Sequence, residues 1–86
     1  MLSLLRNMQP TLLARFISEN GIRPGQLATI SGVSRQHIYR LKMDRAEPTL
    51  PVMRWLTEGA CYVLKRRVEV AELFDLTINV NEEMLR

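Results

Sequence analysis

The first periodic pattern of apolar residues lies between positions 11 and 20. Apolar side chains recur there three or four residues apart, at Leu12, Leu13, Phe16 and Ile17. Pro10 precedes the pattern and Gly21 follows it, which is typical of the two boundaries of a helix. The pattern therefore predicts a helix over residues 11–20 with those four side chains facing inward.

A second and a third short helix are expected next. Residues 23–25 (Arg-Pro-Gly) interrupt the first pattern, and the helix after them has three inward-facing positions, at Leu27, Ala28 and Ile30. Ser34 can cap the third helix, because its hydroxyl can accept a hydrogen bond from a free amide of the next turn. We also expect the small residues Ala28 and Gly32 to let the two helices cross closely.

The third helix is expected to end in a loop over residues 44–48. Ile38 and Leu41 lie three residues apart and face inward, and Val33 anchors the turn before them. The loop combines charged residues with Pro48, which disfavours helical backbone at Glu47. These positions predict a short helix that exposes its opposite face.

A long helix is expected from Thr49 to about Arg66. Thr49 is a favourable N-cap, and Pro51 lies just inside the helix start. Trp55 is expected to pack beside the inward stripe, which consists of Leu50, Met53, Leu56, Ala60, Val63 and Leu64.

A short helix and a strand are expected in the last part of the chain. A helix or turn around residues 71–74 would close the core, and apolar and polar residues alternate from Leu76 to Asn81. This strand either pairs with the same strand of a second copy, docks on its own domain or frays. We predict an all-α, five-helix single domain over residues 1–86, with a core at about 11–75 and an extension at 76–86.

Charge is distributed unevenly along the chain. Residues 1–68 carry eleven Lys or Arg and four acidic residues, a balance of +7, whereas residues 69–86 carry one Arg and five acids, a balance of −4. Clustered positive charge favours a polyanionic partner such as nucleic acid, although a merely basic surface gives the same count. The run Lys65-Arg66-Arg67 is either a second nucleic-acid patch or, as we favour, a response to the dipole at a helix C-terminus.

The few reactive side chains argue against catalysis. Cys61 is the only cysteine, so no intrachain disulfide can form, and we interpret it as a buried structural thiol. His37 is the only histidine and has no ligand at metal-binding spacing. We therefore expect no enzymatic activity, no metal and no cofactor. No segment has the apolar length of a membrane span or signal-peptide core, so the cytoplasm is the expected location.

The third helix presents a polar face suited to hydrogen bonding. Arg35 and Tyr39 lie four residues apart, as do Gln36 and Arg40, so all four can point away from the Ile38/Leu41 stripe. Arg can bind guanine through two hydrogen bonds and Gln can bind adenine likewise, while Tyr can contact a thymine methyl or a phosphate. A helical hairpin that merely packs, or that binds protein, is the alternative interpretation.

The sequence resembles the lambda-repressor-like, Cro/CI-type (XRE) helix-turn-helix family over about residues 11–66. The resemblance is carried by three segments and two apolar positions, namely Leu27-Ala28, Ser31-Gly32-Val33-Ser34, Glu47-Pro48-Thr49-Leu50, and Ile38 with Leu41. It implies a DNA-binding transcriptional regulator, most simply a repressor that binds an inverted-repeat operator as a homodimer without a cofactor.

The resemblance also implies roles for individual residues. Base-reading positions are Arg35, Gln36, Tyr39 and Arg40, and phosphate-contacting positions are Arg23, Gln26, Ser34, His37, Lys42 and Arg45. Two residues depart from the family pattern. Pro24 stands where members often have a phosphate-binding Gln, and Asp44 stands where many have a loop glycine. An antitoxin, which binds both its own promoter and a toxin protein through an acidic C-terminal surface, is the alternative function.

Overall fold

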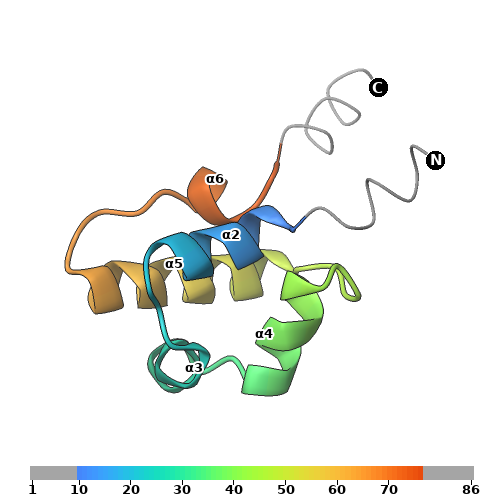
Figure 1. Cartoon of the computed structure of the whole chain (residues 1–86), viewed down its shortest axis with the longest axis horizontal. Helices are drawn as coiled ribbons and strands as arrows, with labels where there is room; N and C mark the ends of the chain where they lie inside the picture. Colours follow the sequence, from blue (N-terminus) through green and yellow to red (C-terminus); the bar gives the residue numbers. More distant parts are fainter. Residues whose placement is uncertain (1–9, 77–86) are drawn as a thin grey trace.

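A computed structural model describes residues 10–76, and every regular element in this range is a helix (Figure 1). Its elements are α2 (Leu12–Glu19), α3 (Pro24–Ser31), α4 (Arg35–Lys42), α5 (Leu50–Leu64) and α6 (Val70–Leu73). The all-helical class is therefore confirmed for this range. The strand predicted over residues 76–81 lies outside the described residues except for Leu76. No helix in the described range is long and apolar enough to cross a membrane.

Three helices begin at a hydroxyl cap. The side chains of Thr11, Ser34 and Thr49 each accept a hydrogen bond from a backbone amide of the first turn, those of Ala14 (3.0 Å), His37 (3.1 Å) and Val52 (3.3 Å). The caps predicted at positions 34 and 49 are confirmed. The Thr11 hydroxyl also donates to the Lys42 carbonyl over 2.8 Å, so it joins the start of α2 to the end of α4.

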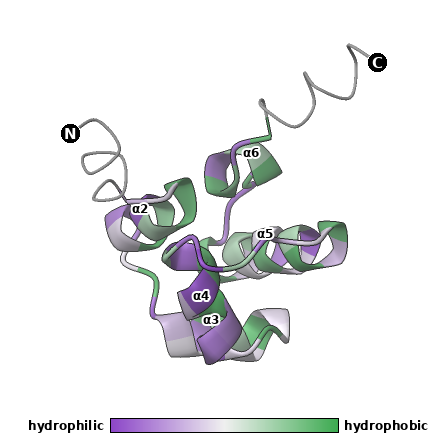
Figure 2. Cartoon of the chain, turned by 90° about the vertical axis from the view of Figure 1, so that its right-hand side faces the viewer, coloured by the Kyte–Doolittle hydropathy of each residue, from purple (hydrophilic) through white to green (hydrophobic). Residues whose placement is uncertain are grey.

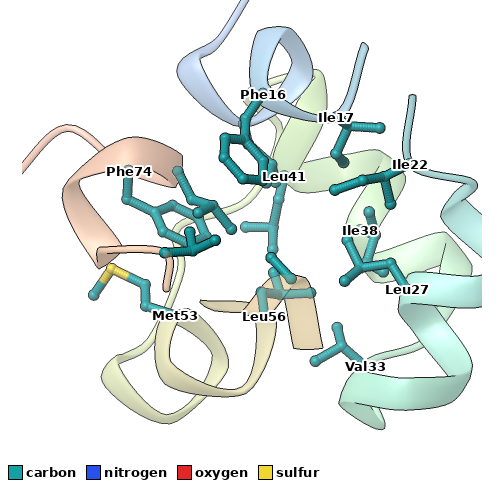
Figure 3. Close-up of a cluster of buried hydrophobic side chains, with 14 residues drawn as sticks. Phe16, Ile17, Ile22, Leu27, Val33, Ile38, Leu41, Met53, Leu56 and Phe74 are labelled. Carbon is teal, nitrogen blue, oxygen red and sulfur yellow. The ribbon is translucent and has the colours of Figure 1, made fainter. Parts of the chain in front are cut away.

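The core lies where α2, α3, α4, α5 and α6 meet (Figure 3). It consists of Leu13, Phe16, Ile17, Ile22, Leu27, Val33, Ile38, Leu41, Met53, Leu56, Ala60, Val68, Leu73 and Phe74. The prediction that Ile30 and Leu50 face inward is wrong, because Ile30 is 41% exposed and Leu50 is 77% exposed. Leu50 is the first residue of α5. Trp55 is 48% exposed, so the stripe covers only half of it.

Helices α3 and α5 approach each other closely at Gly59. A Cβ atom added there would lie 3.1 Å from Ser31 Cβ and 3.2 Å from Leu27 Cδ1, closer than most real Cβ contacts. Gly59 therefore lets α3 pack directly onto α5. The close approach of helices predicted at Gly32 is wrong, because a Cβ at Gly32 would meet nothing within 4 Å.

Gly32 is required by the backbone conformation instead. It ends α3 in the left-handed region, with φ of 80°, and its amide donates to the Ala28 carbonyl. Residues with a Cβ atom adopt this conformation at a cost, whereas glycine adopts it freely. The turn of residues 32–34 then directs α4 away from α3.

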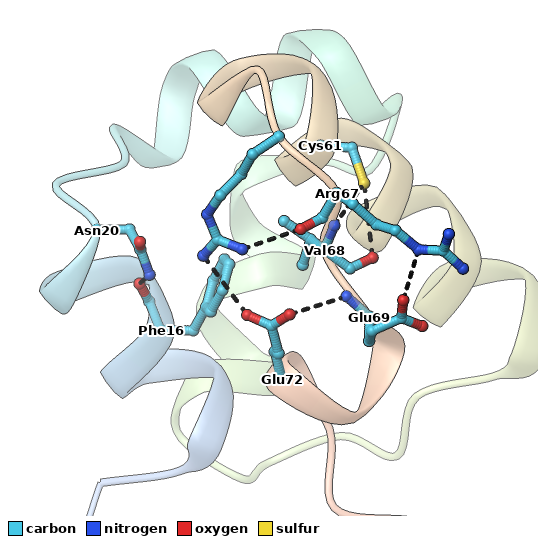
Figure 4. Close-up of polar contacts among 8 residues, drawn as sticks. Phe16, Asn20, Cys61, Arg67, Val68, Glu69 and Glu72 are labelled. Carbon is cyan, nitrogen blue, oxygen red and sulfur yellow. Dashed lines mark hydrogen bonds and ion pairs between the residues drawn. The ribbon is translucent and has the colours of Figure 1, made fainter.

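The chain after α5 is held by polar contacts around Cys61 and α6 (Figure 4). The Val68 amide donates to Cys61 Sγ over 3.3 Å, and the thiol donates to the Val68 carbonyl over 3.6 Å. The thiol is partly rather than fully buried, but its role is structural. The two carboxylates of the α6 capping box pair with two of the basic residues of the run at 65–67, Glu72 with Arg66 and Glu69 with Arg67.

Replacing Gly32 by Ala is expected to lower the free energy of unfolding by about 1 kcal/mol, because the left-handed backbone becomes strained. Gly25→Ala is the matched control, since Gly25 lies in helical backbone with its nearest neighbours at 3.8 Å. That change should be neutral or raise stability by about 0.5 kcal/mol. Urea unfolding of both variants checks this, and equal effects would contradict it.

Replacing Gly59 by Val is expected to destabilise the protein by about 1–3 kcal/mol, because the added carbons meet Ser31 and Leu27. Tyr62→Val is the control on the same helix, because Tyr62 is 70% exposed, and it should stay within about 0.5 kcal/mol of the parent. Thermal unfolding followed by circular dichroism measures both. A Gly59→Val variant as stable as the parent would show that α3 does not pack closely here.

Candidate nucleic-acid interface

The candidate interface is the outer face of α4. The inner face of the same helix packs into the core and so determines which side chains the outer face exposes. Ile38 and Leu41 are 0% and 5% exposed and insert into the core (Figure 3). The Ser34 cap and the Thr11–Lys42 hydrogen bond hold the two ends of α4. Because both ends and the inner face are constrained, the rotation of α4 about its axis is fixed, and so is the set of side chains it exposes.

All four predicted base-reading residues lie on this outer face. Arg35, Gln36, Tyr39 and Arg40 are exposed, and the α4 ribbon is predominantly hydrophilic where it faces the viewer in Figure 2. Within residues 10–76, none of these side chains forms a hydrogen bond or an ion pair. The structure therefore brings together four side chains whose polar atoms are available to an external partner.

The positive charge is divided between paired and unpaired groups. The ion pairs of the described chain are Arg15–Glu19, Arg54–Glu58, Arg66–Glu72 and Arg67–Glu69, all outside the α3–α4 segment. No Asp or Glu occurs from position 20 to position 43. Five basic residues in or next to this segment have no ion pair in the described range, namely Arg23, Arg35, Arg40, Lys42 and Arg45. The unneutralised charge is thus concentrated around α4.

Four of the predicted phosphate-contacting residues lie at the start of α3 or at the end of α4. Arg23 precedes α3 as its N-cap residue, and Gln26 is exposed in the first turn of that helix. At the other end, Lys42 is the last residue of α4 and Arg45 is exposed in the loop that follows. These residues flank the outer face rather than forming part of it.

The remaining two predicted phosphate contacts are at the start of α4. Ser34 is exposed, but its oxygen already accepts the amide hydrogen of His37 (3.1 Å), so only its hydroxyl hydrogen is available to another acceptor. The His37 side chain is half-buried. Ser34 therefore acts chiefly as a cap in this structure.

Pro24 and Asp44, the two departures from the family pattern, lie at the start of α3 and in the turn after α4. Pro24 begins α3, where it has neither a backbone N–H nor a polar side chain to offer an anion. Asp44 has a φ of 59°, so the turn after α4 adopts the left-handed conformation that a glycine would provide there. The aspartate thus preserves the shape of the turn while adding a negative charge at its surface.

One contact within this region was not foreseen from the sequence. The Arg35 side chain lies over Gly25, and a Cβ added at Gly25 would be 3.8 Å from both Arg35 Cζ and Nε. These residues are ten positions apart and belong to different helices, so helical periodicity gives no signal for the contact.

The potential metal ligands of the described chain do not cluster. Residues 10–76 include no group of three or more His, Cys, Asp and Glu side chains that could hold a metal ion. His37 lies on α4, whereas Cys61 lies on α5 with its thiol engaged by Val68. No protein-family model, curated protein or solved structure was found to match this chain.

Proposed function

We propose that this chain is a sequence-specific DNA-binding transcriptional regulator with a lambda-repressor-like helix-turn-helix domain. The observation that carries the proposal is the outer face of α4, which is polar, unpaired and free of acidic residues. A duplex offers base edges to such a face and phosphates to the cations that flank it.

In this proposal α4 enters the major groove, which is wide enough to admit one helix. Gln36 and Arg40 lie one turn apart and reach base edges, where Gln suits adenine and Arg suits guanine. The Tyr39 ring is 50% exposed and can contact a thymine methyl. The fixed rotation of α4 limits which bases each side chain reaches, and this is the physical source of sequence preference.

Phosphate contacts set the position of the protein on the duplex. Arg23 and Gln26 lie at one end of the interface, and Lys42 and Arg45 lie at the other, so they can bind the backbone on both sides of the groove.

Promoter occupancy would then exclude polymerase, which is the simplest form of repression. The proposed location is the cytoplasm.

A homodimer is part of the proposal. Two copies related by two-fold symmetry would read an inverted repeat whose centres are about 34 Å apart. The strand predicted at residues 76–81, which would pair two copies, lies outside the described residues except for Leu76. An antitoxin stays the alternative function; Glu69 and Glu72 of the acidic C-terminal segment pair with Arg67 and Arg66, and residues 77–86 lie outside the described residues.

The proposal is tested by selecting bound duplexes from a random DNA pool with the purified chain at physiological salt. An enriched inverted repeat is the expected result. Gln36→Ala should then weaken binding to that repeat by about 1–3 kcal/mol and relax base choice at one position of each half-site.

Gln26→Ala is the matched control for this substitution, because Gln26 is exposed in the first turn of α3. Loss of a phosphate contact should weaken binding to all sequences equally and leave the selected motif unchanged. If the folded protein enriches no sequence, the proposed function is wrong. If Gln36→Ala keeps the full base preference, the assignment of base contacts to the outer face of α4 is wrong.

The flanking cations predict a defined dependence on salt. Arg45→Ala should reduce the slope of log affinity against log salt concentration by about 0.9, because one fewer counterion is released. Arg54→Ala removes the same charge from α5, where the Arg pairs with Glu58, and it should leave the slope unchanged. Fluorescence anisotropy titrations at several salt concentrations measure both slopes. Equal slopes for the two variants would contradict this placement of the interface.

A further inference from the structure

We propose that Arg35 binds a DNA phosphate rather than a base, although it occupies the first position of the reading helix. This inference rests on the proposed function and assigns one residue within it. The sequence pattern groups Arg35 with Gln36, Tyr39 and Arg40, because all four share the exposed face of α4. The structure gives a reason to separate Arg35 from the other three.

The reason is the contact between Arg35 and Gly25. The three atoms nearest to a Cβ added at Gly25 all belong to Arg35, with Cζ and Nε at 3.8 Å and Cδ at 3.9 Å. The end of the side chain therefore lies along the first turn of α3 at van der Waals distance. Gly25 has no side chain of its own there, so the guanidinium can occupy that surface.

This placement puts Arg35 beside the residues assigned to the DNA backbone. Arg23 and Gln26 belong to the same end of α3 as Gly25, since they are its N-cap residue and a first-turn residue. In a helix-turn-helix complex the first helix crosses the phosphate backbone while the second lies in the groove. A guanidinium that rests on α3 is thus at the level of the phosphates, whereas Gln36 and Arg40 are free to point at base edges.

The local charges favour an anion at the same position. Arg35 is exposed and forms no ion pair in the described chain, and no Asp or Glu occurs between positions 20 and 43. Pro24 has neither an N–H nor a polar side chain with which to bind the phosphate itself. Arg35 therefore adds a charged donor beside Pro24, next to Arg23 and Gln26. To read a base, it would have to leave Gly25 and extend along α4.

The test compares Arg35→Ala, Arg35→Lys and Gln36→Ala by duplex selection and by anisotropy titration at several salt concentrations. Arg35→Ala is expected to weaken binding to every sequence by about tenfold, which is the loss of one charged hydrogen bond. It should lower the salt slope by about 0.9 and leave the selected motif intact. Arg35→Lys should restore the slope, because a point charge suffices for phosphate but not for bidentate guanine recognition.

Gln36→Ala provides the contrast, since it should relax base choice with no change of slope. A motif that relaxes at one position in both Arg35 variants would overturn the inference and leave the proposed function standing. Failure of the parent protein to enrich any sequence would overturn both. Circular dichroism of each variant confirms that it is folded, and the exposed position of Arg35 makes a folding defect unexpected.

Discussion

The arrangement of the described helices depends on the contact of α3 with α5 at Gly59. Leu27 is fully buried at this contact, and Gly59 removes the side chain that would hold the two helices apart. Helices normally pack 8–10 Å apart according to the side chains between them. A glycine at the crossing fixes α3 close to α5, and the left-handed Gly32 then sets the direction of α4. The exposed face of α4 is therefore a consequence of packing on its far side.

Electrostatics divides the surface of the described chain into two parts. Carboxylates on α2, α5 and α6 neutralise Arg side chains within the protein, as in Arg15–Glu19 and Arg66–Glu72. Such exposed pairs contribute little to stability, but they reduce the positive charge that those regions present to a partner. The segment from α3 to the end of α4 contains no acidic residue and no ion pair. The distribution of ion pairs is more informative than the net charge, because it locates the surface to which we assign the proposed polyanionic partner.

Much of the described fold follows from local sequence patterns. The helix caps at Ser34 and Thr49, the inward positions Ile38 and Leu41, and the exposed face that opposes them all result from interactions within a few residues. A cap needs a hydroxyl three residues before a free amide, and a helix face needs apolar residues three or four positions apart. Such rules extend over one or two turns, which explains why the boundaries of α2, α4 and α5 were predicted within about two residues.

Tertiary structure decided what depends on contacts between distant residues. Ile30 and Leu50 fit an apolar stripe but are exposed, because no other element covers them. The contacts of Gly59 with Ser31 and of Arg35 with Gly25 join positions on different helices, and no local periodicity encodes them. The sequence by itself therefore determined the helices, their caps and the composition of the α4 face. Only tertiary packing decided how closely α3 approaches α5 and where the Arg35 guanidinium lies, because both depend on which surfaces meet in space.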